Sequence, residues 1–153
     1  MMLMWLVACA AEPGVVATID GWVVADEDPF NDVVDGDCDE RGIAVEGAGV
    51  EVQTDVCPYV TMRQPALLAV PKGSVVTADL WYLDLWAVDP SQGHAAIQVG
   101  ESVDEIRPDI PGAADAHTFQ LTTTSRIHEG DDVYFHVHNH GANSWYLGEM
   151  SWK

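Results

Sequence analysis

Histidines at alternate positions carry the clearest chemistry in this sequence. His136 and His138 lie in an apolar, strand-like run within residues 130–141. Alternate side chains of a strand share a face, so these two histidines and Tyr134 are predicted to point away from the core. The residues between them are apolar and are predicted to face inward: Val133, Phe135 and Val137. Two such imidazoles are about 6.6 Å apart at the backbone, close enough to bind one ion.

A complete metal site would need one or two further ligands from other parts of the chain. His94, His117, His128 and nearby carboxylates are the available donors. Imidazole ligands suit zinc or copper best. His140 is about 13 Å from His136 if the strand continues, too far to share the ion. The alternative is that these histidines hydrogen-bond within the sheet or to a polar ligand.

The spacing of Gly130, His136 and His138 resembles the start of the first cupin motif. In cupins this pair of histidines binds a metal inside a jelly-roll barrel. Ala142 and Asn143 stand where the motif expects a glutamate. The resemblance implies a metal-binding, cupin-like protein that uses His136 and His138, and it leaves open whether that metal serves catalysis or binding alone.

A second cation site is suggested by the acidic stretch between residues 26 and 40. Asp35, Asp37 and Asp39 alternate, and Glu46 follows seven residues later. These offsets match four ligand positions of an EF-hand loop, which binds calcium through oxygen. The competing interpretation is a solvated or partly disordered acidic loop.

Aromatic residues suggest a carbohydrate platform. One face of the predicted strand carries Tyr82, Asp84 and Trp86, and aromatic rings beside a carboxylate suit a sugar. The other face is assigned to the core and carries Trp81, Leu83 and Leu85. The predicted ligand surface combines both strands: Tyr134, His136, His138, Asn139, His140, Asn143, Tyr82, Asp84 and Trp86.

The elements that must position these residues are strands throughout. Short runs rich in Val, Thr, Ile and aromatics are separated by Gly and Pro, which predicts an all-β, single antiparallel β-sandwich, jelly-roll-like, or a small barrel. The predicted strands cover residues 15–25, 43–54, 56–63, 66–70, 74–87, 94–100, 117–124, 132–139 and 144–152. Residues 101–116 are predicted to be a long irregular connection, and residues 145–147 the hairpin partner of the histidine strand. The body loosely resembles carbohydrate-binding β-sandwiches, which implies a polar ligand such as a glycan.

The first nine residues are apolar and end in Leu6-Val7-Ala8-Cys9. This tetrad resembles the lipobox of bacterial lipoproteins, which implies cleavage before Cys9 and a lipid on its sulfur. Cys38 and Cys57 make an even pair, as expected for one disulfide in an oxidising compartment. The predicted organisation is a signal segment (1–8), a tether and acidic loop (9–42) and a β-sandwich (43–153), anchored in a Gram-negative envelope and facing the periplasm or the cell surface.

Composition restricts the partners further. Twenty-five acidic residues face six basic ones, a net charge of −19. Nucleic acid is excluded as a partner because phosphate binding needs clustered Lys and Arg. No Gly-x-Ser-x-Gly elbow or phosphate loop is present, and no catalytic residue is predicted. The main hypothesis is a lipid-anchored module that binds a glycan or another envelope component. The alternatives are the cupin-like metal protein and a structural envelope lipoprotein without a small ligand.

Overall fold

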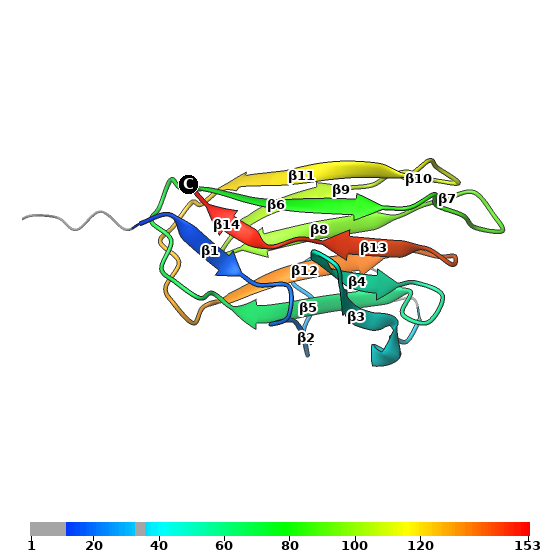
Figure 1. Cartoon of the computed structure of the whole chain (residues 1–153), viewed down its shortest axis with the longest axis horizontal. Helices are drawn as coiled ribbons and strands as arrows, with labels where there is room; N and C mark the ends of the chain where they lie inside the picture. The colour runs from blue at the N-terminus through cyan, green and yellow to red at the C-terminus, as the bar shows by residue number, and fades with distance from the viewer. Residues whose placement is uncertain (1–11, 33–35) are drawn as a thin grey trace, which may run out of the picture.

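The fold is a sandwich of two antiparallel sheets, seen in a computed structural model that describes residues 12–32 and 36–153 (Figure 1). The first sheet has the order β1-β14-β6-β13-β4-β3, and β11 also pairs with β6. Its strands are β1 (Gly14–Ala17), β3 (Ile43–Glu46), β4 (Gly49–Gln53), β6 (Val75–Tyr82), β11 (Asp115–Thr122), β13 (Ser144–Leu147) and β14 (Met150–Trp152).

The second sheet has five strands in the order β2-β5-β12-β8-β9. They are β2 (Val23–Val24), β5 (Tyr59–Pro65), β8 (His94–Val99), β9 (Ser102–Ile106) and β12 (Asp132–His138). A separate pair joins β7 (Ser91–Gln92) to β10 (Asp109–Ile110), and a 3-10 helix, η1 (Glu40–Gly42), precedes β3. The all-β, antiparallel prediction is confirmed. Among the residues described, no helix has the length and apolar character needed to cross a membrane.

The core lies between the sheets because each strand turns its apolar side inward. The five-stranded sheet contributes the fully buried side chains of Phe135 (β12) and Met62 (β5). The other sheet contributes the fully buried side chains of Leu80, Trp145 and Leu147. Val133 and Val137 are buried as predicted, so the face assignment of the histidine strand is confirmed.

Several predicted boundaries are wrong. Gly47, at a positive φ of 59°, turns the chain between β3 and β4, so residues 43–54 form two strands. Residues 66–70 form only an isolated bridge, between Val70 and Ile127. Residues 101–116 contain β9 and β10 and the start of β11 instead of an irregular connection. Residues 15–25 and 144–152 are each divided into two short strands.

Two predictions about strand neighbours and faces also fail. β13 pairs with β4 and β6 in the opposite sheet, so it is not the hairpin partner of β12. β6 ends at Tyr82, and its buried side chains are Val76, Ala78, Leu80 and Tyr82. Trp81, which was assigned to the core, therefore lies on the opposite face and is only partly buried. Leu83, which was assigned to the core, is 57% exposed, because the chain leaves the sheet there.

Candidate functional site

The outer face of the five-stranded sheet carries a cluster of imidazoles. His136 pairs with Thr61 of β5 and Ala96 of β8, and His138 pairs with Tyr59 and His94 in the next row. Antiparallel pairing places opposite side chains on the same face. Three strands therefore bring His94, His136 and His138 together, although only the last two are close in sequence.

The acidic stretch folds over this face instead of standing in solvent. Phe30 packs on His136 with ring centroids 5.2 Å apart and meets His94 edge-on at 6.5 Å. Glu27 accepts a hydrogen bond from Tyr134 at 3.2 Å. Under this cover His136 is 0% exposed and His94 is 2% exposed. The predicted partly disordered loop is thus, over residues 26–32, a packed cover of the sheet.

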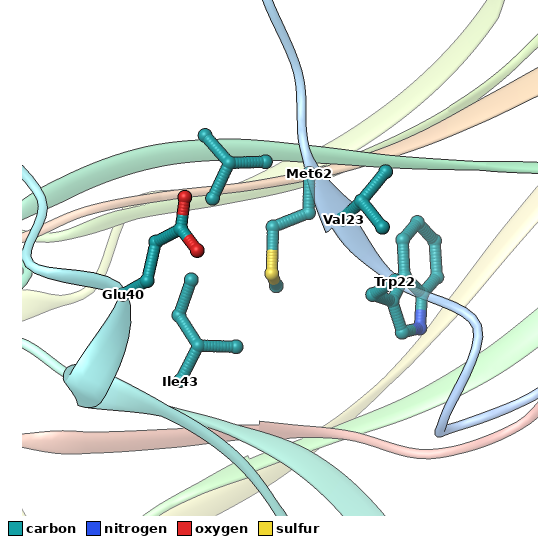
Figure 2. Close-up of a pocket in the computed structure, with 6 residues that line it drawn as sticks. Trp22, Val23, Glu40, Ile43 and Met62 are labelled. Carbon is teal, nitrogen blue, oxygen red and sulfur yellow. The ribbon is translucent and has the colours of Figure 1, made fainter.

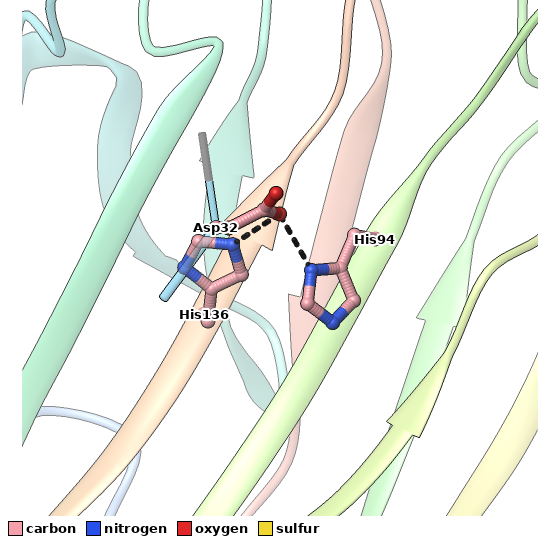
Figure 3. A group of neighbouring side chains, drawn as sticks. All are labelled: Asp32, His94 and His136. Carbon is pink, nitrogen blue, oxygen red and sulfur yellow. Dashed lines mark hydrogen bonds and ion pairs between the residues drawn. The ribbon is translucent and has the colours of Figure 1, made fainter. Parts of the chain in front are cut away.

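One carboxylate oxygen lies at the centre of the cluster (Figure 3). Oδ2 of Asp32 is 2.7 Å from Nδ1 of His94, 3.1 Å from Nδ1 of His138 and 3.4 Å from Nε2 of His136. Among the described residues, Asp32, His94 and His136 form the group whose ligand atoms all lie within 4.8 Å of one another. We call Asp32, His94, His136 and His138 the histidine cluster.

Each imidazole of the histidine cluster also meets a second partner through its other nitrogen. Nδ1 of His136 is 2.8 Å from Oγ1 of Thr61. Nε2 of His94 is 2.9 Å from Oε2 of Glu105. Nε2 of His138 is 3.2 Å from Nε2 of His140. The orientation of every ring is therefore fixed from both sides.

Carboxylates outnumber basic groups around the histidine cluster. Thr61 donates to Oδ1 of Asp28 at 3.0 Å, and the Tyr59 hydroxyl donates to the other carboxylate oxygen of Asp28. Arg107 lies 3.3 Å from Nε2 of His94 and 3.7 Å from Glu105. The carboxylates of Asp28, Asp32 and Glu105 and one guanidinium thus lie beside the imidazoles. These surroundings favour positive charge at the histidine cluster.

Burial sets the protonation of the covered groups. It lowers the pKa of His136 to about 4, with Asp28 and Asp32 opposing this effect and His94 adding to it. Burial also opposes ionisation of Asp28, but hydrogen bonds from Tyr59 and the Phe30 amide hold its pKa below the ordinary value. His136 is therefore a neutral imidazole near pH 7, the form that binds metal ions.

A second feature is a groove at the end of the sandwich where the chain passes from β6 to β7. The cavity measures about 350 Å³ and is lined by Trp86, Ala87, Val88, Asp89, Pro90, Ser91, His140 and Gly141. Trp86 is 58% exposed. We call this the Trp86 groove.

The backbone of Trp86 is held by the neighbouring turn. Oδ1 of Asn143 accepts a hydrogen bond from the Trp86 amide at 2.6 Å, and Nδ2 of Asn143 donates to the Trp86 carbonyl at 3.0 Å. Thr54 holds this turn from beneath, since its hydroxyl bonds the Gly141 carbonyl at 2.6 Å and accepts from Asn139 at 2.8 Å. Asn139 and Asn143 are buried and position the groove without lining it.

The predicted ligand surface is therefore divided. Trp86 and His140 line the groove, whereas His136 and Tyr82 are buried. Asp84 accepts from the Ala114 amide at 2.8 Å. Among the predicted extra metal donors His94 joins the cluster, while His128 contacts Asp131 and His117 packs against Phe119 on β11.

The predicted calcium ligands are engaged elsewhere or not described. Asp35 lies outside the described residues, as do the lipobox and Cys9. Asp39 caps η1 and pairs with Arg41, Glu46 shares a hydrogen bond with Glu51, and Asp37 is exposed. The disulfide between Cys38 and Cys57 is present as predicted and ties this stretch to the chain just before β5. Calcium binding here stays a prediction.

A further cavity, of about 330 Å³, lies between β2, η1 and β5 (Figure 2). Trp22, Ile43 and Met62 point into it, with Glu40 at one side. Five of its six lining residues are of apolar type, and Glu40 is the charged one. It therefore offers little that could orient a polar ligand.

No protein-family model matches this chain, and no curated protein is significantly similar to it. A solved arabinose-bound α-L-arabinofuranosidase, MgGH51, is similar over 93% of this chain at 10% identity and a TM-score of 0.50, and this chain spans 24% of that protein. TmCBM61, solved with β-1,4-galactotriose, has 11% identity and a TM-score of 0.48, covering 90% of each chain. A family 29 carbohydrate-binding module has 9% identity and a TM-score of 0.47, covering 92% of this chain and 91% of its own. These similarities concern the β-sandwich fold alone.

Proposed function

We propose that this protein is a carbohydrate-binding module and that the Trp86 groove is its binding site. The observation that carries the proposal is an indole 58% exposed at the wall of a groove of about 350 Å³. Small-ligand sites are concave, mostly apolar and bear a few polar groups that fix orientation. The apolar face of a sugar ring would stack on the indole of Trp86.

The polar groups for sugar hydroxyls lie beside this ring. His140, Asp89 and Ser91 line the same groove. An imidazole and a hydroxyl both donate and accept hydrogen bonds, and a carboxylate accepts them. The net charge of −19 repels anions, so neutral or cationic sugars are the expected ligands.

Fixation of the backbone supports a binding role for Trp86. Asn143 holds both its amide and its carbonyl, and Leu85 exchanges two hydrogen bonds with Gly112 on the other side. A side chain on an immobilised backbone loses less conformational freedom when a ligand binds. The histidine cluster suits this role poorly because its imidazoles lie under the acidic loop.

The proposed ligand class agrees with the name of a similar solved structure that has a TM-score of 0.50. That enzyme is named as an arabinose-bound arabinofuranosidase, and this chain spans a quarter of it. A sugar is therefore the first class of ligand to test. If no sugar binds, the hypothesis that remains is a structural envelope protein without a small ligand.

The test is a glycan array followed by calorimetric titration of the best oligosaccharide. Trp86→Ala is expected to weaken binding by about tenfold or more, because it removes the stacking ring. Leu83→Ala is the matched control, since Leu83 is also exposed on this connection but does not line the groove. An array without ligands, or equal binding by the two variants, would contradict the proposal.

We also propose that the module is held at a membrane by a lipid on Cys9. The Cys38–Cys57 disulfide supports an oxidising, extracytoplasmic location. Expression in a Gram-negative host should place the protein in the membrane fraction, with a mass increased by the acyl groups. Cys9→Ser should release it from that fraction, and an unmodified wild-type Cys9 would exclude the anchor.

A further inference from the structure

We propose that the histidine cluster is a binding site for one divalent transition-metal ion of the zinc or copper kind. The ligands would be Oδ2 of Asp32, Nδ1 of His94 and Nε2 of His136, the group whose ligand atoms all lie within 4.8 Å of one another. His138 lies outside that group, with its Nδ1 3.1 Å from Oδ2 of Asp32. The proposal does not depend on sugar binding, although the two sites are neighbours: His140 of the Trp86 groove lies 3.2 Å from His138.

The distances from Asp32 to the ring nitrogens are close to those between ligand atoms of a metal ion. A tetrahedral ion with bonds of about 2.0–2.1 Å has ligand atoms roughly 3.3 Å apart. Oδ2 of Asp32 is 2.7, 3.1 and 3.4 Å from the three ring nitrogens. One carboxylate and two imidazoles, with a further position open, are a ligand set that zinc and copper accept.

The hydrogen-bond pattern around His136 places its ring proton away from Asp32. The Thr61 hydroxyl donates its hydrogen to Asp28, since a carboxylate can only accept. Oγ1 of Thr61 must then accept from Nδ1–H of His136, 2.8 Å away. A neutral imidazole has one ring proton, so Nε2 presents a lone pair to Asp32. A lone pair facing a carboxylate oxygen is repulsive unless a proton or a metal ion lies between them.

His94 is the second imidazole that faces Asp32. Its two nitrogens face two carboxylates, Glu105 at 2.9 Å and Asp32 at 2.7 Å. The Arg107 guanidinium, which can only donate, lies 3.3 Å from Nε2, and a hydrogen bond from it would direct Nδ1–H at Asp32. Donation from Nε2–H to Glu105 instead directs the lone pair of Nδ1 at Asp32, which is the arrangement that a bound metal ion requires. Histidine ligands of metal ions commonly donate their second ring N–H to a carboxylate in this way.

The surroundings complete the site. Phe30 and Tyr59 pack against His136, with ring centroids 5.2 and 5.1 Å away, and reduce access of water. An apolar shell of this kind strengthens electrostatic attraction inside it. The ion would join the acidic loop, through Asp32, to strands β8 and β12.

The experiment uses the full chain with its disulfide, stripped by a chelator and titrated separately with Zn²⁺ and Cu²⁺ by calorimetry. Metal content after dialysis is then measured by mass spectrometry. We expect one ion per chain, a rise in melting temperature on binding, and visible absorption typical of tetrahedral Co²⁺ after substitution with cobalt. Asp32→Asn and His94→Gln should each weaken binding by more than 100-fold, since each removes a ligand.

Two further variants keep the test decisive if those variants fold poorly. Glu105→Gln alters a half-exposed partner of His94 and should weaken binding by about 10–100-fold. His128→Gln is the matched control, because His128 is exposed and contacts Asp131 outside the cluster. Failure of the folded wild-type protein to take up either ion would leave a hydrogen-bonded cluster only and overturn the proposal. Unchanged affinity in Asp32→Asn, or equal losses in His128→Gln and Glu105→Gln, would overturn it as well.

Discussion

Asn143 uses both ends of its side-chain amide on the backbone of Trp86, accepting from its N–H at 2.6 Å and donating to its carbonyl at 3.0 Å. The two residues are 57 positions apart in the sequence. The amide thus supplies the partners that a neighbouring strand would otherwise provide. An irregular connection that carries an exposed indole is in this way held like an edge of the sheet.

Asn143→Ala should lower the free energy of unfolding by about 1–3 kcal/mol, because it leaves two backbone groups of Trp86 without these partners. Chemical denaturation followed by tryptophan fluorescence measures the change. Gln120→Ala, at an exposed position of β11, is the control and should stay within about 0.5 kcal/mol of wild type. A loss for Asn143→Ala no larger than the control's would show that the clamp adds nothing to stability.

Gly141→Ala should disturb the Trp86 groove directly. Gly141 has a φ of 122°, and a Cβ there would lie 2.0 Å from the Trp86 carbonyl oxygen. The backbone must therefore shift, at a cost of about 1–3 kcal/mol. Denaturation and sugar titration should both register the shift. Gly130→Ala, which has a positive φ but nothing within 4 Å of its Cβ, separates the cost of backbone conformation from that of the clash.

Glu51 should contribute to the acid sensitivity of the fold. Burial opposes its ionisation, but hydrogen bonds from Ser144, Gln53 and Tyr146 hold its pKa below the ordinary value of 4.5. A depressed folded-state pKa stabilises the protein above the unfolded value, and this contribution is lost as pH falls through the folded-state pKa. Glu51→Gln should therefore be less stable than wild type at pH 7 and show a shallower loss of stability below about pH 4.5. Parallel curves of stability against pH for the two proteins would contradict this assignment.

Removal of the disulfide should destabilise the protein by about 3 kcal/mol. The bridge joins residues 19 positions apart and limits the unfolded chain accordingly. The double variant Cys38→Ser and Cys57→Ser, compared with wild type by denaturation, measures the loss. Wild type under reducing conditions should approach the double variant. If its stability is instead unchanged by a reductant that opens the bridge, the disulfide does not stabilise the fold.

The fold class could be predicted because alternation is a local property. Val133, Phe135 and Val137 are apolar at every second position, and this pattern alone placed His136 and His138 on the outer face. Alternation does not identify the neighbouring strand. The chain after His138 crosses to the other sheet, where Trp145 pairs with Val52 and Tyr82, and nothing near Trp145 indicates that partner.

The sequence could not predict that His94 and Asp32 join His136 and His138 in the histidine cluster. His94 was one of several equivalent donors, and Asp32 reaches His136 across 104 positions of sequence. The signal that was missed is Phe30, a large apolar residue within a strongly acidic stretch. Such a residue needs a surface to bury it, which indicates that the stretch packs on the sheet.

The described chain enters the sandwich through β1 at the end opposite the connection between β6 and β7 (Figure 1). The molecule therefore has a base and a tip, with the Trp86 groove at the tip. Copies attached to a surface through their N-terminal side would each turn the Trp86 groove toward solution. Neighbouring copies would then bind one polysaccharide molecule simultaneously.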